Sequence, residues 1–336
     1  MTSSRWLRQA AVGGVVWLAF LIWNHPSPFE IGWGVSLLLL SPLVLVPLGL
    51  SLADRFSSSP LADALLKHVA RFQLPAATLA AAAFLMSDGV AAALLCGPWL
   101  IVTGLIALAG VDRVRRRGLS ACAASCFDAG LVYVVIGAGW LVMSRAGLRP
   151  LDFPPLIVLL TAMHFHHAGF VLPLLAGLAA EVDRGRLARA GAIGVVAGVP
   201  LVAVGITATQ LGLPPVLESV VVTITSASAF VVAMTHLRLS AHRDWPRRIR
   251  LLFAVAGTSL AISMLLALTY GWRFFLPVQF LDIPWMRATH GTANAFGFAL
   301  TGMIAWNAAR AANAQTTEHQ SSKAGYDESK ETMNDT

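Results

Sequence analysis

Ten apolar segments of membrane-spanning length follow one another along this sequence of 336 residues, and no other feature restricts its fold as much. A helix needs about 20 apolar residues to cross a hydrocarbon core about 30 Å thick. The third segment is short and Ala-rich, and only Ser87, Asp88 and Gly89 separate it from the fourth. The segments are residues 7–23, 31–50, 72–87, 90–110, 121–143, 155–180, 191–211, 216–237, 251–271 and 285–309. The sequence therefore predicts an all-α polytopic transmembrane helical bundle of about ten helices.

The composition agrees with a chain surrounded by lipid. Hydrophobic residues make up 57% of the sequence and charged residues only 12%, whereas about 25% of the residues of a soluble domain are charged. The net charge of +7 would be compatible with nucleic-acid binding in a soluble protein. Here the basic residues lie in short loops between the apolar segments. We therefore expect a lipid bilayer as the partner, and no nucleic acid.

The positions of the basic residues predict how the helices are oriented. With a cytoplasmic N-terminus, 20 of the 24 Lys and Arg residues fall on the cytoplasmic side, as the positive-inside rule requires. The sequence thus predicts that both termini are cytoplasmic, in a bacterial cytoplasmic (inner) membrane. Residues 1–310 form the predicted membrane domain, and the polar residues 311–336 a predicted disordered cytoplasmic tail. The outer side holds only Arg145, Arg149, Arg273 and Arg287.

Two predicted spans contain clusters of polar residues, which are costly in lipid and are functional candidates. In the sixth span, His164 and His167 are three residues apart and share a helix face, while His166 projects away from them. In the tenth span, a stripe of polar and small residues runs along one face. It consists of His290, Asn294, Gly297 and Thr301.

A third candidate is Glu218, near the outer end of the eighth span. The sixth and tenth spans both enter from the outer side, and helical rise puts their polar clusters at similar depths. The sequence therefore predicts a site of His164, His290 and Asn294 in the outer-to-middle membrane, with Glu218 above them. His166 and His167 complete the set of candidate residues.

Several kinds of chemistry fit these residues. Neutral imidazole is a common metal ligand and titrates near neutral pH, so His164, His166 and His290 are candidate ligands of a divalent metal or of haem. The same groups suit proton relay or the binding of a small molecule or ion in a transporter. Intramembrane His and Asn also form interhelical hydrogen bonds without any further role. A receptor or assembly scaffold is a third class, and the oligomeric state is not predicted.

Other polar residues have simpler interpretations. Asp112 and the following run of arginines to Arg117 are expected in a solvated cytoplasmic loop, and His236 at the inner membrane interface. Asp128 is expected to be a buried charge with Tyr133 as its partner. The sequence contains no Walker loop, no H-E-x-x-H, no G-x-S-x-G and no C-x-x-C-H motif, which disfavours ATP-driven transport by this chain alone, zinc proteolysis, serine hydrolysis and covalent haem attachment.

The two histidine motifs resemble those of one known family. The segments TAMHFHHAGF (161–170) and HGTANAFGF (290–298) are similar to the HFHxAGF and HGxxNAxGF runs of the YndJ family of bacterial membrane proteins. The resemblance covers mainly residues 110–309. It implies a membrane-embedded helical protein with roles for His164, His166, His290, Asn294 and Glu218, and makes His167 the variable position. The family's activity is essentially uncharacterised, so the resemblance implies no reaction, cofactor or substrate.

Overall fold

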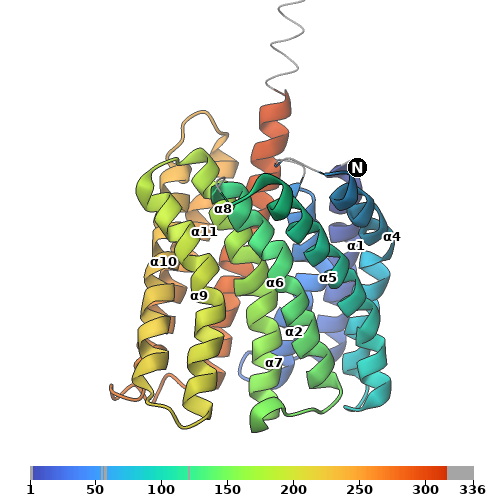
Figure 1. The fold of residues 1–336 in the computed structure, drawn as a ribbon, viewed down its shortest axis with the longest axis vertical. Coiled ribbons are helices and arrows are strands. Elements are labelled where there is room, and N and C mark those ends of the chain that lie inside the picture. The colour runs from blue at the N-terminus through green and yellow to red at the C-terminus, as the bar shows by residue number, and fades with distance from the viewer. Residues whose placement is uncertain (1–2, 54–55, 57–58, 120–121, 316–336) are drawn as a thin grey trace, which may run out of the picture.

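The computed structural model describes residues 3–53, 56, 59–119 and 122–315, and they form a bundle of helices (Figure 1). The first five helical passes are α1 (Ser3–Asn24), α2–η1–α3 (Ile31–Leu40, Ser41–Leu45, Val46–Leu50), α4–η3 (Pro60–Ala82, Ala83–Leu85), α5 (Val90–Arg117) and α6 (Cys122–Arg145). The next four are α7–η5–α8 (Pro155–His164, Phe165–Val171, Leu172–Val182), α9 (Arg186–Gln210), α10 (Val216–Ser240) and α11 (Arg247–Gly271). The last pass comprises α12 (Ile283–Met286), η6 (Arg287–Gly291), η7 (Ala293–Leu300) and a helix that continues to residue 315.

These described elements confirm the all-α polytopic bundle. Among the described residues, eight of the passes are long and apolar enough to cross a membrane. The pass at α4 carries Asp63, Lys67 and Arg71 in its first half, and the last pass alternates between α and π segments. The two described ends of the chain lie at the same end of the bundle (Figure 1), which is what an even number of passes requires.

Some predicted boundaries were wrong. The helix α4 begins at Pro60 rather than at residue 72, because the Ser59 side chain accepts a hydrogen bond from the Ala62 N–H and caps it. The helix α5 runs on through Arg117, so the arginines expected in a loop are helical. The last helix includes residues 311–315 of the predicted tail, and residues 316–336 lie outside the described residues.

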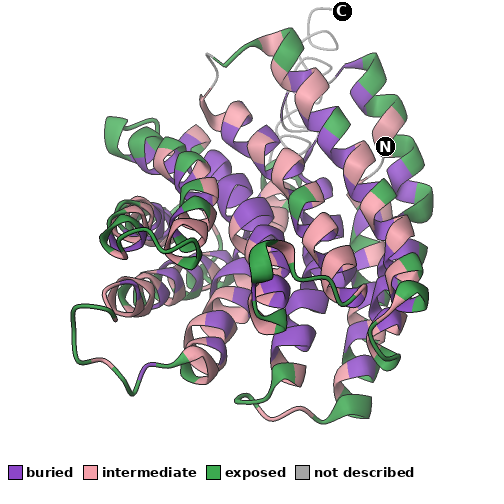
Figure 2. Ribbon diagram, turned by 60° about the horizontal axis from the view of Figure 1, so that its bottom comes forward, coloured by how far each residue is buried: buried purple, intermediate pink, exposed green. Residues whose placement is uncertain are grey.

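The pass α2–η1–α3 is the most enclosed part of the bundle. Within its most apolar stretch of 18 residues, 83% are buried, compared with 28% in the corresponding stretch of α1 at the periphery. Buried residues gather in the middle of the bundle, and exposed ones lie at its rim and loops (Figure 2). Close packing relies on glycine where α6 crosses α8, because a Cβ on Gly177 would lie 2.5 Å from the Ala123 carbonyl oxygen.

Three passes contain π-helical segments, in which the normal helical hydrogen bonding is interrupted: η1, η5, and η6 with η7. Side chains from other passes donate hydrogen bonds to backbone carbonyl groups of these segments. Gln73 Nε2 donates to the Pro42 carbonyl at 2.6 Å, and Ser41 Oγ donates to the His166 carbonyl at 3.1 Å. These cross-links tie the interrupted passes to their neighbours and so fix the walls of the site described next.

Candidate functional site: a cavity within the helical bundle

A cavity of about 480 Å³ lies mainly among α7–η5, α9, α10, α11 and the last pass, and Leu37 of α2 and Ile136 and Trp140 of α6 also line it. Most of its wall is apolar, from side chains such as Leu160, Val202, Ile206 and Met264. Five of the six predicted site residues line it: His164, His167, Glu218, His290 and Asn294. Residues more than 120 positions apart in the sequence thus face one space.

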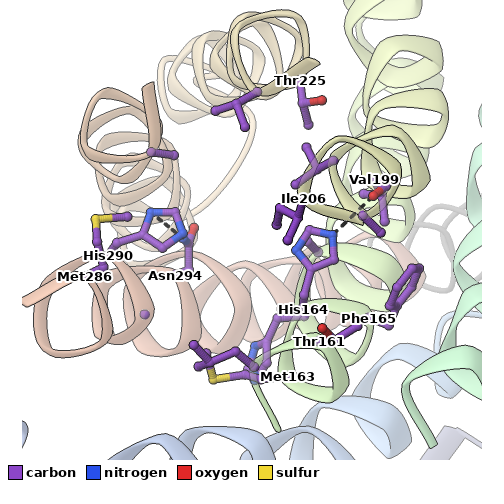
Figure 3. A pocket seen from close by; sticks show the side chains of 18 of the residues that line it. Thr161, Met163, His164, Phe165, Val199, Ile206, Thr225, Met286, His290 and Asn294 are labelled. Carbon is purple, nitrogen blue, oxygen red and sulfur yellow. Dashed lines mark hydrogen bonds between the residues drawn. The ribbon is translucent and has the colours of Figure 1, made fainter. Parts of the chain in front are cut away.

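His164 projects into this cavity from the end of α7. Its Nε2 lies 3.3 Å from the carbonyl oxygen of Val199 on α9. Because a carbonyl only accepts, Nε2 carries the hydrogen in this bond, and Nδ1 remains an acceptor. His164 and the pair His290–Asn294 face each other from opposite sides of the cavity (Figure 3).

His290 and Asn294 form a hydrogen-bonded unit on the last pass. His290 Nδ1 lies 2.9 Å from the Ser263 carbonyl oxygen on α11, so it donates to that oxygen. The other ring nitrogen, Nε2, then accepts from Asn294 Nδ2 at 3.2 Å. Lower on the same stripe, Gly297 packs directly on α11, since a Cβ there would lie 2.2 Å from Ser259 Oγ. The predicted stripe is therefore a cavity wall at one end and a close helix contact at the other.

His166 lies apart from the cavity and is fully buried. Its Nδ1 is 2.8 Å from the Ala162 carbonyl oxygen and its Nε2 accepts from Trp99 Nε1 at 3.0 Å, so both ring nitrogens are used. The structure does not bring His166 together with His164 and His290 as the three-ligand metal set requires. No cluster of three or more His, Cys, Asp and Glu side chains with metal-holding geometry occurs in the described part of the chain.

His167 shares the cavity face with His164, as the helical spacing predicted. Its Nε2 lies 2.9 Å from the Leu37 carbonyl oxygen of α2. Its Nδ1 is buried and has no hydrogen-bond partner among the described residues. His167 thus links the cavity to the most enclosed pass of the bundle.

Glu218 lies at the predicted outer end of the cavity, beside an arginine that was not among the predicted site residues. The carboxylate is only 4% exposed and lies 2.7 Å from a guanidinium nitrogen of Arg273. Arg273 and Arg287 both line the cavity. From the sequence they were interpreted only as determinants of topology. The spacing of Arg287 and His290, three residues apart on one helix face, was the signal that would have identified Arg287.

Two other predictions were wrong. His236 is fully buried rather than interfacial, with its ring 5.7 Å from that of Phe298 and 6.0 Å from that of Phe253. Tyr133 is not the partner of Asp128, because its hydroxyl donates to the Val196 carbonyl at 2.9 Å. The Val196 carbonyl lacks its normal helical donor, because the residue four positions later in α9 is Pro200, which has no N–H.

Asp128 is buried as predicted, but its partners are two arginines of the α5 C-terminus. Its carboxylate oxygens lie 2.9 Å from Arg113 Nε and 2.7 Å from a terminal nitrogen of Arg117. Arg113 is itself only 3% exposed. The run of arginines is therefore divided between a buried ion-pair network and the solvated helix end.

The fold defines this chain as a multi-pass α-helical membrane protein, and polar side chains from several of its passes meet at one cavity. The chain matches the family of YndJ-like proteins over residues 36–298 and belongs to that family. It is 29% identical over 302 residues to "Uncharacterized membrane protein YndJ" of Bacillus subtilis (strain 168). The matched region covers 89% of this chain and 52% of that relative, so the chain spans about half the relative's length. No solved structure matches.

Proposed function

We propose that this chain is a transporter of the bacterial cytoplasmic membrane that receives a small molecule or ion from the outer side into the cavity. The observation that carries the proposal is the meeting of His164, Glu218, His290 and Asn294, from three separate passes, around one largely apolar space. Ligand sites typically combine an apolar wall with a few convergent polar groups. Ionisable groups within a membrane commonly mark a substrate or proton pathway.

A route from the outer end supports this proposal. A second hollow of about 600 Å³ lies at that end of the bundle and shares Tyr270, Arg273 and Ile283 with the cavity. The ion pair between Glu218 and Arg273 stands where the two spaces adjoin. An ion pair between different helices can open by side-chain rotation, so this pair is suited to act as the outer gate.

The interrupted helices also favour transport over a static role. The histidines lie in or next to η5 and η6, where π segments replace regular α-helix. Interrupted helices at mid-membrane are characteristic of substrate and ion sites in transporters, and π segments occur frequently at functional sites.

The test is a screen for transport currents in proteoliposomes that contain the full chain, with amino acids, organic acids, amines and inorganic ions applied at several pH values. We expect at least one class to give a saturable, pH-dependent current that falls at least tenfold in His164→Ala and Asn294→Ala. His68→Ala is the matched control, because His68 lies on an exposed helix face away from the cavity. A current unchanged in both cavity variants would contradict the proposal.

The alternative is a metal- or haem-binding redox protein that uses the same histidines. With His166 saturated by its own hydrogen bonds, the two remaining members of the predicted ligand set are His164 and His290, which lie on opposite sides of the cavity (Figure 3). An absorption spectrum and a metal analysis of the purified protein test this alternative. A Soret band or near-stoichiometric metal that is lost in His164→Ala and His290→Ala would favour it over transport, and a colourless, metal-free protein would exclude it.

A further inference from the structure

Two guanidinium groups and one carboxylate line the outer end of the cavity. Glu218 and Arg273 form an ion pair, and Arg287 adds a second guanidinium to the same wall. Arg287 is 4% exposed. Asp282, in the adjoining hollow, acts on Arg287 electrostatically, but no carboxylate of the described residues forms an ion pair with it. A cation so placed is costly unless it acquires a partner.

The position of Arg287 is fixed by the surrounding passes. Its aliphatic stem lies against Gly34 of α2, where a Cβ would approach Arg287 Cδ to 2.9 Å. One terminal guanidinium nitrogen donates to the Phe29 carbonyl, while the buried Nε has no partner among the described residues. The side chain is therefore held in place but retains hydrogen-bonding capacity, as expected of a preorganised anion contact.

Arg273 provides a second, more exposed cation on the way in. Its guanidinium carbon lies 4.4 Å from the centre of the Tyr270 ring and 4.2 Å from that of Phe274. Its side chain is 27% exposed and borders both the cavity and the outer hollow. An anion that entered from outside would meet Arg273 first and would compete with the Glu218 carboxylate for its guanidinium group.

Below these arginines aliphatic side chains make up much of the wall, with Val202, Ile206, Val222 and Leu260 facing the space. We propose that the cavity binds an amphipathic anion, whose carboxylate or phosphate contacts Arg287 and Arg273 and whose alkyl chain lies between α9, α10 and α11. This inference rests on the proposed function in taking the cavity to be the ligand site. It adds the sign of the ligand's charge and the apolar character of the rest of the ligand.

The test measures binding of radiolabelled decanoate to the purified full chain in detergent, by scintillation proximity. Decanoate should bind saturably and be displaced by decyl phosphate, but not by decanol or decylamine at equal concentration. Arg287→Gln should weaken binding at least tenfold, and Arg287→Lys should weaken it less and keep the preference for anions. Arg149→Gln is the matched control, since Arg149 is an exposed outer arginine that does not line the cavity, and should remain within twofold of the unsubstituted protein.

Two results would overturn the inference. One is displacement of decanoate by decanol as effectively as by decyl phosphate. The other is unchanged decanoate binding in an Arg287→Gln protein that elutes as a single species and retains the thermal unfolding midpoint of the unsubstituted chain. Either result could coexist with transport of another solute, so pH-dependent currents that require His164 and Asn294 would keep the proposed function while the anion class is rejected.

The anionic group could be carried by a free solute or by a membrane lipid, and nanodiscs separate these two sources. If a lipid headgroup is the ligand, phosphatidylglycerol nanodiscs should reduce decanoate binding at least threefold relative to phosphatidylcholine nanodiscs. If the ligand is a free anion, binding should be equal in the two lipids. Both results support an amphipathic anion and assign its source, whereas an absence of decanoate binding in detergent and in both lipids would overturn the inference.

Discussion

Three neighbouring histidines of this chain have three different environments. His164 faces the cavity, His166 has both ring nitrogens bonded within the protein, and His167 connects the cavity wall to the Leu37 carbonyl. The helical period was sufficient to predict which of them share a face. Their partners could not be predicted, because Trp99, Val199 and Leu37 lie on other passes and only tertiary packing brings them close.

The same limit applied to Asp128. Its burial followed from its place within an apolar segment, but its partners belong to the preceding helix. The charge run of Arg113–Arg117 was typical of a solvated loop, and only the extension of α5 brings two of these arginines to Asp128. The missed residues Arg273 and Arg287 have a similar explanation, because a basic residue beside a span looks the same in sequence whether it faces lipid headgroups or a cavity.

We predict that Asp128→Asn strongly destabilises the protein. The substitution leaves Arg113 and Arg117 without the carboxylate that they share, and loss of one member of a buried ion pair costs about 3–5 kcal/mol. The measurement is the free energy of unfolding in mixed micelles by SDS titration. Asp244→Asn serves as the control, because the side chain of Asp244 is 86% exposed and its change should stay within about 0.5 kcal/mol. Equal stabilities of the two variants would contradict the buried network.

Among the elements, the π segments are the features that the apolar pattern could not reveal. Hydropathy reports the cost of placing a residue in lipid, and it is insensitive to the hydrogen-bond register within a helix. Near η1 the cause is visible in the sequence. Pro42 has no N–H, and the Ser41 N–H donates to the Leu38 carbonyl. The Leu37 carbonyl is thereby left for His167.

This arrangement predicts the effect of removing the His167 donor. In His167→Leu the buried Leu37 carbonyl loses its side-chain partner, at a cost of about 1–3 kcal/mol in unfolding free energy. His167→Gln, which keeps a donor, should recover part of this loss. The same substitution at the exposed His68, whose Nδ1 is 2.8 Å from the Ala64 carbonyl within one helix, should have little effect. A His167→Leu protein as stable as the His68→Leu protein would show that the contact to α2 is not required.

For the whole molecule, the distribution of charge predicted much of the architecture. The alternation of basic and weakly charged loops gave ten passes with both ends on one side, and the structure has ten helical passes in its described residues with both described ends together (Figure 1). The cavity itself could not be predicted from the distribution of charge. Similar depths made it possible that His164 and Asn294 would meet, but only the packing of α9 on α10, of α10 on α11 and of α11 on the last pass leaves a space between them.

The central claim is that water and solutes reach this cavity from the outer side, and two neighbouring positions on α9 test it most directly. Ala203 lines the cavity, whereas the adjacent Val204 is 62% exposed on the outside of the bundle, where lipid would cover it. Each is replaced by cysteine in a chain whose Cys96, Cys122 and Cys126 are changed to alanine. The ionised thiolate is the reactive form, so a thiol in water reacts and one in lipid does not.

Intact cells are then treated with a membrane-impermeant sulfonated methanethiosulfonate, and the labelled fraction of each variant is measured after purification. The structure and the predicted orientation together require that Ala203→Cys is labelled from outside at least tenfold faster than Val204→Cys. If Ala203→Cys remains unlabelled until the membrane is permeabilised, or reacts no faster than Val204→Cys, the cavity does not open to the outer side and the account is wrong.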